Sequence, residues 1–416
     1  MLIVHTSDLH IGISRYSESP IYRAYLDVLE EISLKTIESK VKYLVVSGDM
    51  FHTTDPSYEP TLEVVRILKK LRESGVRVVV VPGNHDNSPT RKSILYLLAE
   101  AGLIHLLDYD ELYDYLVVKP AVYDEVVFYG IPGFRGSKEV EYVKSGLLKF
   151  KDLKTYEKSE IIVVAHISAK VYEYDPSKYF SRYGKLSTDE GELLRKTPAT
   201  ARYVALGHIH IPLPLERKFK AKMAYPGAPI GMDANDLRET AILLEKGFKR
   251  RILLVDTSSE PPEVTSIDLE NAPYVKLVRI EASTPDEVVE RVKVALQDMP
   301  SQGHRALLAY VEGMERLDPR LLAIIRSLSI KNNVHIEVHL VRKEELLSIP
   351  LLEDVFEEIH TLEFEDIEER VLKELISKSS VQLDFAKLKW LLNKLSEPVP
   401  DSKLGELLQE LKRELD

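Results

Sequence analysis

The sequence predicts an α/β protein made of two successive α/β domains and a helical end. Short runs of β-branched residues alternate with amphipathic helical patterns, which is typical of α/β domains with largely parallel strands. A proline- and acid-rich break at 258–263 divides this alternation into a longer first part and a shorter second part. At 416 residues, the chain also exceeds the length at which one hydrophobic core usually keeps growing.

The first part contains six short apolar runs that we expect to be buried strands. They span residues 2–6, 43–47, 77–81, 126–130, 161–165 and 203–206. Helical patterns lie between the early runs, at residues 22–39, 60–74 and 90–102. Further strands are expected at 223–226, 240–245 and 251–255. Residues 1–257 are therefore predicted to form one α/β domain.

The second part repeats the alternation on a smaller scale. Strand, helix, strand, helix and strand are expected in turn at 274–281, 285–298, 305–312, 319–327 and 334–341. This pattern predicts a small α/β unit over residues 264–345. After it, residues 346–380 are predicted to be an acidic linker, and two amphipathic helices are expected within 381–416.

The net charge of -11 is concentrated at the C-terminal end of the chain. Residues 346–416 hold 9 Lys and Arg against 17 Asp and Glu, so they carry -8 and leave only -3 for residues 1–345. The first part can therefore still present a basic face to nucleic acid. Four basic residues are candidates for DNA contacts, although a solvated charged hairpin explains them equally well. They are Arg217, Lys218, Lys220 and Lys222.

The composition argues against several kinds of protein. The chain contains no cysteine, so thiolate chemistry is excluded. No apolar run approaches the ~18 residues of a membrane span, and we expect a soluble intracellular protein with no membrane partner. The chain has no GxxxxGK[ST] motif, so any ATP dependence must come from a partner protein.

Side chains that bind divalent metals well follow five of the strand-like runs. The five blocks read SDLHIG, GDMFH, GNHD, AHIS and GHIH. Because ligands gather at the carboxyl ends of strands in open α/β sheets, we expect the blocks to converge. Their imidazole nitrogens and hard oxygens suit manganese, iron or zinc. The seven candidate ligands are Asp8, His10, Asp49, Asn84, His166, His208 and His210.

These ligands predict a phosphoesterase centre with two metal ions. Asp49 has two carboxylate oxygens and can bridge the ions. Two cations ~3.5–4 Å apart would polarise a phosphodiester and deprotonate a shared water, so no Ser or Cys nucleophile is needed. His85 is a candidate general acid for the leaving oxygen, and His52 could orient or charge it. A single such fragment is weak evidence, but five blocks in compatible order indicate one site.

In these five blocks the chain resembles the calcineurin-like metallophosphoesterases. Within them it looks most like the archaeal Mre-eleven DNA repair nucleases and their bacterial counterpart SbcD, over essentially the whole chain. The resemblance implies a core of two packed mixed sheets flanked by helices, a small α/β cap and a C-terminal helical module. It also implies 3′ to 5′ exonuclease and single-strand endonuclease action on DNA, and a cytoplasmic, nucleoid-associated location.

The same resemblance implies two Mn²⁺ ions and assigns ligands to each. One ion would be held by Asp8, His10, Asp49 and His210. The other would be held by Asp49, Asn84, His166 and His208. His85 would protonate the leaving group with help from His52. Iron, zinc or magnesium stay possible in place of manganese.

The resemblance further implies two protein partners. One is an ATPase of the Rad-fifty type, bound by the C-terminal helices, although their apolar stripes could instead fold back on the cap or pair with themselves. The candidate contacts are Phe385, Leu388, Trp390, Leu392, Leu404, Leu408 and Leu411. The other partner is a second copy of the chain, bound through N-terminal helices whose apolar residues could equally cover the sheet. These residues are Leu62, Val65, Ile94, Leu97 and Leu98.

Three functions stay open on the sequence alone. The first is a Mn²⁺-dependent nuclease that processes DNA ends in double-strand-break repair together with the ATPase. The second is a phosphatase or cyclic-nucleotide phosphodiesterase with the same metal site, which the overall acidity favours. The third is a scaffold that bridges DNA ends without needing catalysis, which the complete ligand set disfavours.

Overall fold

A computed structural model gives the fold of residues 1–341. Within that range it does not describe residues 89, 125, 157, 173, 180–182 and 185. The acidic stretch at 346–380 and the helices expected within 381–416 lie outside the described residues, together with all seven candidate ATPase contacts. Within the described part, no helix has the length and apolarity that a membrane span requires.

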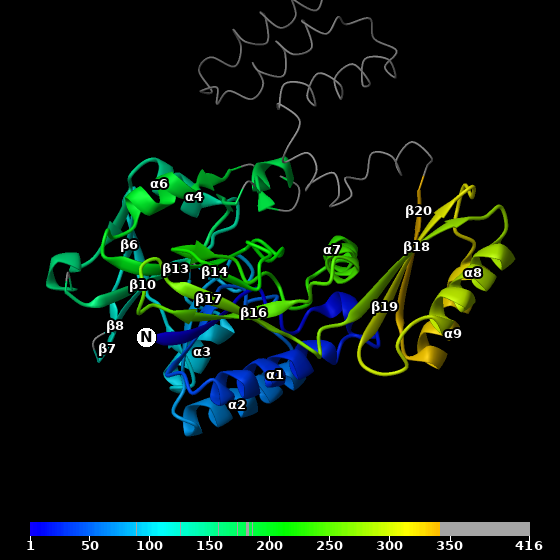
Figure 1. The fold of residues 1–416 in the computed structure, drawn as a ribbon, viewed down its shortest axis with the longest axis horizontal. Coiled ribbons are helices and arrows are strands. Elements are labelled where there is room, and N and C mark those ends of the chain that lie inside the picture. Colours follow the sequence, from blue (N-terminus) through cyan, green and yellow to red (C-terminus); the bar gives the residue numbers. More distant parts are fainter. Residues whose placement is uncertain are drawn as a thin grey trace, which may run out of the picture. The chain divides into compact units, whose positions relative to one another are not determined.

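A seven-stranded mixed sheet forms one layer of the N-terminal domain (Figure 1). Its centre consists of β-branched runs buried on both faces, which favours parallel pairing. The parallel strands are β1 (Leu2–Thr6), β2 (Tyr43–Ser47), β3 (Arg77–Val81) and β4 (His105–Leu106). On the other side of β1 follow the antiparallel strands β16 (Arg251–Asp256), β17 (Glu263–Asp268) and β14 (Lys218–Lys220).

A second sheet packs against one face of the first. Its strands, in spatial order, are β15 (Met223–Ala224), β13 (Ala201–Gly207), β10 (Glu160–His166), β8 (Val126–Ile131) and the antiparallel β7 (Ala121–Tyr123). Between the sheets, Val45 and Val79 share a buried cluster with Phe128 and Val164. This confirms the two packed mixed sheets that the resemblance implied.

Helices cover the outer faces of both sheets (Figure 1). The other face of the first sheet shares a buried cluster with α1 (Ala24–Glu38), α2 (Tyr58–Glu73) and α3 (Ile94–Glu100). Beyond the second sheet lie α4 (Lys138–Lys144) and α6 (Glu190–Lys196). Smaller elements are β5 (Tyr109–Leu112), β6 (Tyr115–Val118), β9 (Leu148–Phe150), β11 (Ala169–Lys170), β12 (Thr188–Asp189), η1 (Ser14–Tyr16), η2 (Leu153–Tyr156) and η3 (Pro176–Tyr179).

The strand expected at 240–245 is wrong, because these residues end a helix, α7 (Ala234–Glu245). The run is apolar and begins with a β-branched residue, which suggested a strand. The start of the helix is fixed further upstream, where the Asp233 side chain accepts hydrogen bonds from the N–H groups of Asn235 and Asp236. Leu237 and Ala241 are then buried one turn apart, as a helix packed on one side requires.

The first domain extends beyond residue 257, where the sequence placed its end. The proline-rich segment at 258–263 joins β16 to β17 as a hairpin, and β17 pairs with β16 along its whole length. The predicted boundary was wrong because prolines mark a tight connection within a sheet as readily as a linker. The first sheet therefore includes residues up to Asp268.

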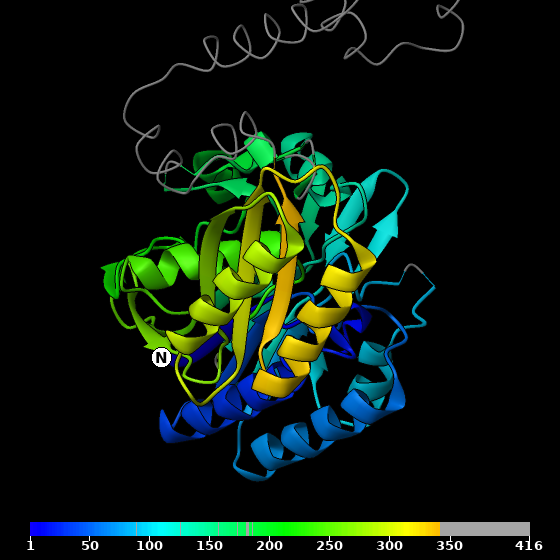
Figure 2. The same ribbon diagram turned by 90° about the vertical axis from the view of Figure 1, so that its right-hand side faces the viewer.

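The capping unit has the element order that the sequence predicted. β18 (Tyr274–Glu281), β19 (Arg305–Glu312) and β20 (His335–Leu340) form a parallel sheet. The two crossover helices, α8 (Pro285–Gln297) and α9 (Pro319–Asn332), lie on the same face of this sheet (Figure 2). On the other side, Leu308 and Tyr310 join the buried cluster of the N-terminal domain.

Candidate metal centre

The five predicted blocks meet where strands of both sheets end. His166 is the last residue of β10, and the other candidate ligands lie in the loops that follow strand ends. The first sheet supplies Asp8, His10, Asp49 and Asn84, and the second sheet supplies His166, His208 and His210. The packing of two sheets thus gathers residues that are far apart in the chain, such as His10 and His210, which are 200 positions apart.

Three of these residues form a group that we call the His210 cluster: Asp8, His10 and His210. Each is buried and offers a ligand atom within 4.8 Å of the other two. The Nε2 atoms of His10 and His210 lie 3.3 Å apart, and Nε2 of His210 lies 3.8 Å from Oδ1 of Asp8. The backbone N–H of His208 donates to both oxygens of Asp8, which fixes this carboxylate in place.

Asn84, His166 and His208 form a second group, which we call the His166 cluster. Nε2 of His166 lies 2.9 Å from Oδ1 of Asn84 and 3.2 Å from Nδ1 of His208. Both imidazoles are oriented by backbone carbonyls. Nδ1–H of His166 donates to the carbonyl of Ser47 at 2.9 Å, and Nε2–H of His208 donates to that of Tyr183 at 3.3 Å.

Asp49 lies between the two clusters. Its Oδ2 atom is 3.3 Å from Nε2 of His166 and 3.9 Å from Nε2 of His10. Its Oδ1 atom accepts a hydrogen bond from the backbone N–H of His85 at 2.9 Å. The carboxylate can therefore serve one ion in each cluster at the same time.

The atoms that face one another in this centre fit divalent cations. When Nδ1 of His166 and Nε2 of His208 carry the donated hydrogens, the remaining nitrogens point lone pairs at each other and at Oδ1 of Asn84. Such lone pairs repel unless a proton on His166 or a bound cation lies between them. Imidazole nitrogens mixed with carboxylate and amide oxygens suit Mn²⁺, iron or zinc.

The electrostatics of the buried centre also attract positive charge. Burial, reinforced by Asp49 and opposed by His166, raises the pKa of Asp8 to about 7. Burial lowers the pKa of His166, but Asp49 and Asp8 outweigh this effect and raise it to about 10. Burial likewise raises the pKa of Asp49, but His166 and His10 hold it below its usual range. Protons therefore compete with a divalent cation for these atoms.

Four of the candidate ligands have an unusual backbone conformation. The φ angles of Asp8, His10, Asp49 and His208 are 53°, 46°, 50° and 95°, in the left-handed region. For residues other than glycine this costs about 1–2 kcal/mol each. Hydrogen bonds between the loops hold it in place, since the N–H of His10 donates to the carbonyl of Asp49 at 3.0 Å. Strain of this kind collects at functional sites.

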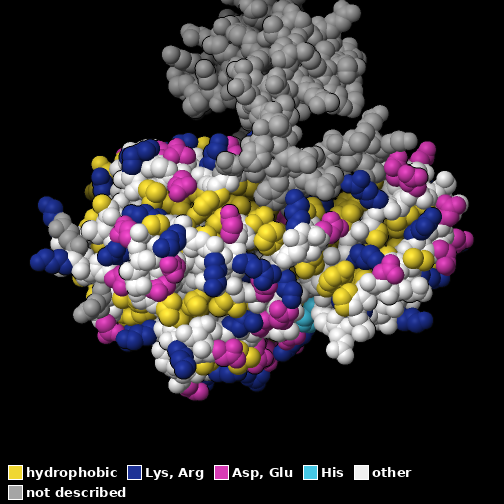
Figure 3. All heavy atoms as spheres, viewed as in Figure 1, with side chains coloured by type: hydrophobic (Ala, Val, Ile, Leu, Met, Phe, Trp, Pro, Cys, Tyr) yellow, Lys and Arg dark blue, Asp and Glu magenta, His cyan; other side chains and the backbone are white. Residues whose placement is uncertain are grey.

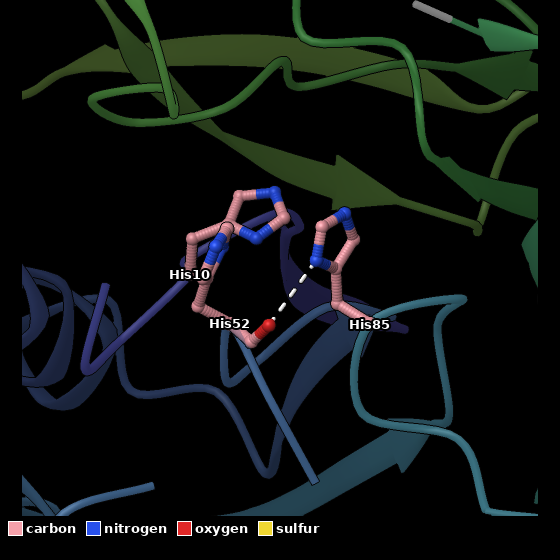
Figure 4. A group of neighbouring side chains, drawn as sticks. All are labelled: His10, His52 and His85. Carbon is pink, nitrogen blue, oxygen red and sulfur yellow. Dashed lines mark hydrogen bonds between the residues drawn. The ribbon is translucent and has the colours of Figure 1, made fainter. Parts of the chain in front are cut away.

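His85 lies beside the His210 cluster, with its ring centroid 4.9 Å from that of His10. Figure 4 shows its Nδ1 directed at the backbone carbonyl of His52, to which it donates at 3.1 Å. The main chain of His52, and not its imidazole, therefore orients His85. Burial and the neighbouring His85 lower the pKa of His52 to about 4. The ring of His52 is therefore neutral and does not supply a proton to His85.

The four basic residues that follow GHIH are mostly paired with carboxylates. Arg217 lies 3.1 Å from Asp268, and Lys220 and Lys222 pair with Glu263 and Glu260 at 3.2 and 2.8 Å. Lys218 lies with them on and around β14. Acidic and basic side chains are interspersed over the face in Figure 3. These pairs favour the interpretation of a solvated charged hairpin and disfavour that of a DNA-contact surface.

Three residues around the centre were missed by sequence reasoning. Asp236 accepts a hydrogen bond from His210, and Tyr183 contacts His208 and His210 through its carbonyl and hydroxyl oxygens. Neither belongs to a block, so no local signal marks them. Asp86 is inside GNHD, and its carboxylate accepts from the N–H groups of Phe51 and Gly83, tying two ligand loops together.

Comparison with known proteins finds similar proteins that are named for DNA repair or as part of a nuclease. The DNA double-strand break repair protein Mre11 of Saccharolobus solfataricus is 26% identical over 326 residues, which cover 77% of each chain. Mre11 of Archaeoglobus fulgidus is 24% identical over 353 residues, 80% of this chain and 72% of that protein. The SbcD component of the nuclease SbcCD from Bacillus subtilis is 26% identical over 274 residues, 62% of this chain and 66% of that protein.

A model of a protein family also matches about half of the chain. The model of the calcineurin-like phosphoesterases matches residues 1–212, a segment that contains every candidate ligand from Asp8 to His210. Members of this family hydrolyse phosphate esters, in agreement with the chemistry expected from the ligands. The chain belongs to the calcineurin-like phosphoesterase family.

Proposed function

We propose that the protein is a Mn²⁺-dependent DNA nuclease that processes the ends of broken DNA. The observation that carries this proposal is the position of Asp49 between two clusters of imidazole and oxygen ligands. A carboxylate shared by two ligand groups is what a phosphodiesterase with two metal ions needs. DNA as the substrate follows from the similarity to proteins named for double-strand break repair and to a nuclease component.

In this proposal Asp8, His10, Asp49 and His210 hold one Mn²⁺ ion, and Asp49, Asn84, His166 and His208 hold the other. Iron, zinc or magnesium could replace manganese, since N and O ligands bind several divalent ions. Bound cations would polarise the phosphodiester, activate water and neutralise the negative charge of the transition state. The protein itself holds the ligands in position, and five of the seven are buried: Asp8, His10, Asp49, His166 and His210.

His85 would act as the general acid. The bond from its Nδ1 to the carbonyl of His52 fixes the ring and leaves Nε2 to donate a proton to the leaving oxygen. The backbone N–H of His85 also holds Oδ1 of Asp49, so acid and bridging ligand are positioned by one loop. His52 would assist through its main chain.

The direction of digestion and the partners are finer parts of the proposal. We expect 3′ to 5′ exonuclease action on duplex ends and endonuclease action on single strands, on nucleoid DNA in the cytoplasm. We also expect a Rad-fifty type ATPase to bind residues 381–416, because the apolar stripes expected there need a partner. Loss of ATPase binding on deletion of 381–416, with Mn²⁺-dependent cleavage kept, would test this assignment.

A homodimer would use α2 and α3. Tyr58 and Leu97 are 79% and 64% exposed on these helices, whereas large apolar side chains usually gain from burial. Leu62, Val65 and Ile94 are half-buried. Leu98 is 2% exposed and packs in the core, so it covers the sheet and leaves the proposed interface to the other four predicted residues and Tyr58.

The deciding experiment compares two substrates under one set of conditions. A labelled DNA duplex with one recessed 3′ end and a small phosphomonoester are incubated with the full chain and Mn²⁺, Mg²⁺ or a chelator. We expect Mn²⁺-dependent shortening of the recessed strand and little monoester hydrolysis. Rapid monoester hydrolysis with intact DNA would make the protein a small-ester phosphatase. Binding of DNA ends without hydrolysis of either substrate would make it a scaffold.

A further inference from the structure

We infer that Asp236 is a positioning residue that fixes the ring of His210 and strengthens the ion position of the His210 cluster. Asp236 lies in the first turn of α7, 26 residues beyond His210 and outside all five blocks. The inference rests on the proposed metal centre. It adds a residue whose role is to hold a ligand and not to contact the ion.

The geometry between the two side chains is that of a carboxylate supporting a metal ligand. Nδ1 of His210 lies 3.0 Å from both Oδ1 and Oδ2 of Asp236. The carboxylate is fully buried, and His210 is 3% exposed. A hydrogen on Nδ1 is therefore held between two oxygens, and the lone pair of Nε2 is directed at His10 and Asp8.

Asp236 is itself held by its surroundings. Its Oδ2 atom accepts the backbone N–H of Met232 at 2.6 Å. Arg250, which is 1% exposed, donates to the backbone carbonyls of both Asp236 and His210 at 2.9 and 2.5 Å. The guanidinium thus joins the backbone of the ligand to the backbone of its support. This rigidity is what accurate positioning of a ligand requires.

The other cluster lacks this arrangement in the residues that the structure describes. There His166 and His208 donate to the carbonyls of Ser47 and Tyr183, which carry no net charge. A carboxylate makes the attached imidazole a stronger base than a carbonyl does, and removal of such support commonly lowers metal affinity about 10–100-fold. Asp236 therefore distinguishes one ion position from the other.

The test compares two substitutions three residues apart on the same helix. Asp236→Asn keeps the size of the side chain but removes its charge. Asp233→Asn is the matched control, because the Asp233 carboxylate caps the same helix by accepting from the N–H groups of Asn235 and Asp236. The full chain is stripped with a chelator and titrated with Mn²⁺ by calorimetry, and its melting temperature is measured without metal.

We expect two binding steps in the unsubstituted chain. In Asp236→Asn the Mn²⁺ affinity of one step should fall about 10–100-fold, while the affinity of the other step stays the same. In Asp233→Asn both affinities should stay within about 2-fold of those of the unsubstituted chain. His10→Gln removes a ligand of the same cluster, so adding Asp236→Asn to it should leave the remaining step unchanged. Two unchanged steps in Asp236→Asn would overturn the inference, and so would equal weakening of both with a lower melting temperature.

A second measurement does not depend on how the variants fold. In metal-free protein labelled with ¹⁵N-histidine, the His210 signals, assigned by their loss in His210→Gln, should show hydrogen on Nδ1. Hydrogen on Nε2 alone would overturn the inference. If the unsubstituted chain binds no Mn²⁺, the proposed function fails. If it binds two ions and Asp236→Asn binds both equally well, only the role of Asp236 fails.

Discussion

The two halves of the metal centre hold their histidines in different ways. In the His166 cluster, both imidazoles donate to backbone carbonyls. In the His210 cluster, His210 donates to the buried carboxylate of Asp236. His166 also keeps a proton in the metal-free protein, since nearby carboxylates raise its pKa to about 10. Similar ligands can therefore make unequal sites, and we expect the His210 cluster to bind its ion more tightly.

The largest effect should come from the residue that the two halves share. Asp49→Asn removes the bridging charge, so we expect both Mn²⁺ steps to weaken and DNA cleavage to fall by more than about 10³-fold. Calorimetry and a gel assay measure the two quantities. Asp55→Asn, on the exposed part of the same loop, is the control and should behave like the unsubstituted protein. Loss of one step alone would show that Asp49 is not shared.

His85→Ala should separate chemistry from metal binding. We expect cleavage to fall by about 10²–10⁴-fold, as on loss of a general acid, with both Mn²⁺ steps kept. His52→Ala keeps the carbonyl that orients His85, so it should cost only about 10-fold or less. Equal losses in the two variants would mean that the imidazole of His52, and not its main chain, supports His85.

Gly133→Ala should disturb one half of the centre. A β-carbon at Gly133 would overlap the ring of His166 and come within 2.9 Å of the backbone nitrogen of Asn84. We expect the ion of the His166 cluster to bind about 10–100-fold more weakly, as after other changes around metal ligands, with the other step intact. Gly136→Ala, where nothing lies within 4 Å of the added carbon but φ is 80°, controls for general strain in this loop.

The smallest effect is a difference in pH dependence. Metal must displace the proton of His166, whose pKa is about 10, whereas Asp8 in the other cluster has lost its proton above its pKa of about 7. Affinity at the His166 cluster should therefore still rise between about pH 8 and pH 9, where affinity at the His210 cluster should level off. One displaced proton gives about a tenfold change in affinity per pH unit. Burial lowers the pKa of His10 well below its usual value, so at that ligand no such proton has to leave. Calorimetry at several pH values should show that Mn²⁺ affinity changes more steeply with pH in the weaker binding step than in the tighter one.

The sequence predicted the parts of the centre that lie next to strand ends. Asp8, His10 and Asp49 stand in short blocks directly after apolar runs, and the structure brings them together because parallel strands end at one edge. The capping unit was also predicted, since each of its elements has a clear period of its own. The apolar run at 240–245 was wrongly predicted to be a strand, because the N-cap that starts α7 lies several residues upstream of this run.

Contacts across the fold could not be predicted from local patterns. Asp236 meets His210 only because the first turn of α7 lies beside the loop after β13, and a single Asp in a helix has no signature of such a role. The orientation of His85 by a carbonyl was equally hidden, because every residue has one. Pairing of the basic residues near β14 with the carboxylates of β17 depends on strand register, which the composition does not show.

The most direct test of the two unequal positions is a crystal of the full chain soaked in Mn²⁺ and measured at the manganese absorption edge. We predict two anomalous peaks about 3.5–4 Å apart. One should lie among the ligands of the His210 cluster and the other among those of the His166 cluster, with Asp49 touching both. At limiting Mn²⁺ the peak at the His210 cluster should fill first. A single peak, or first filling at the His166 cluster, would contradict the account.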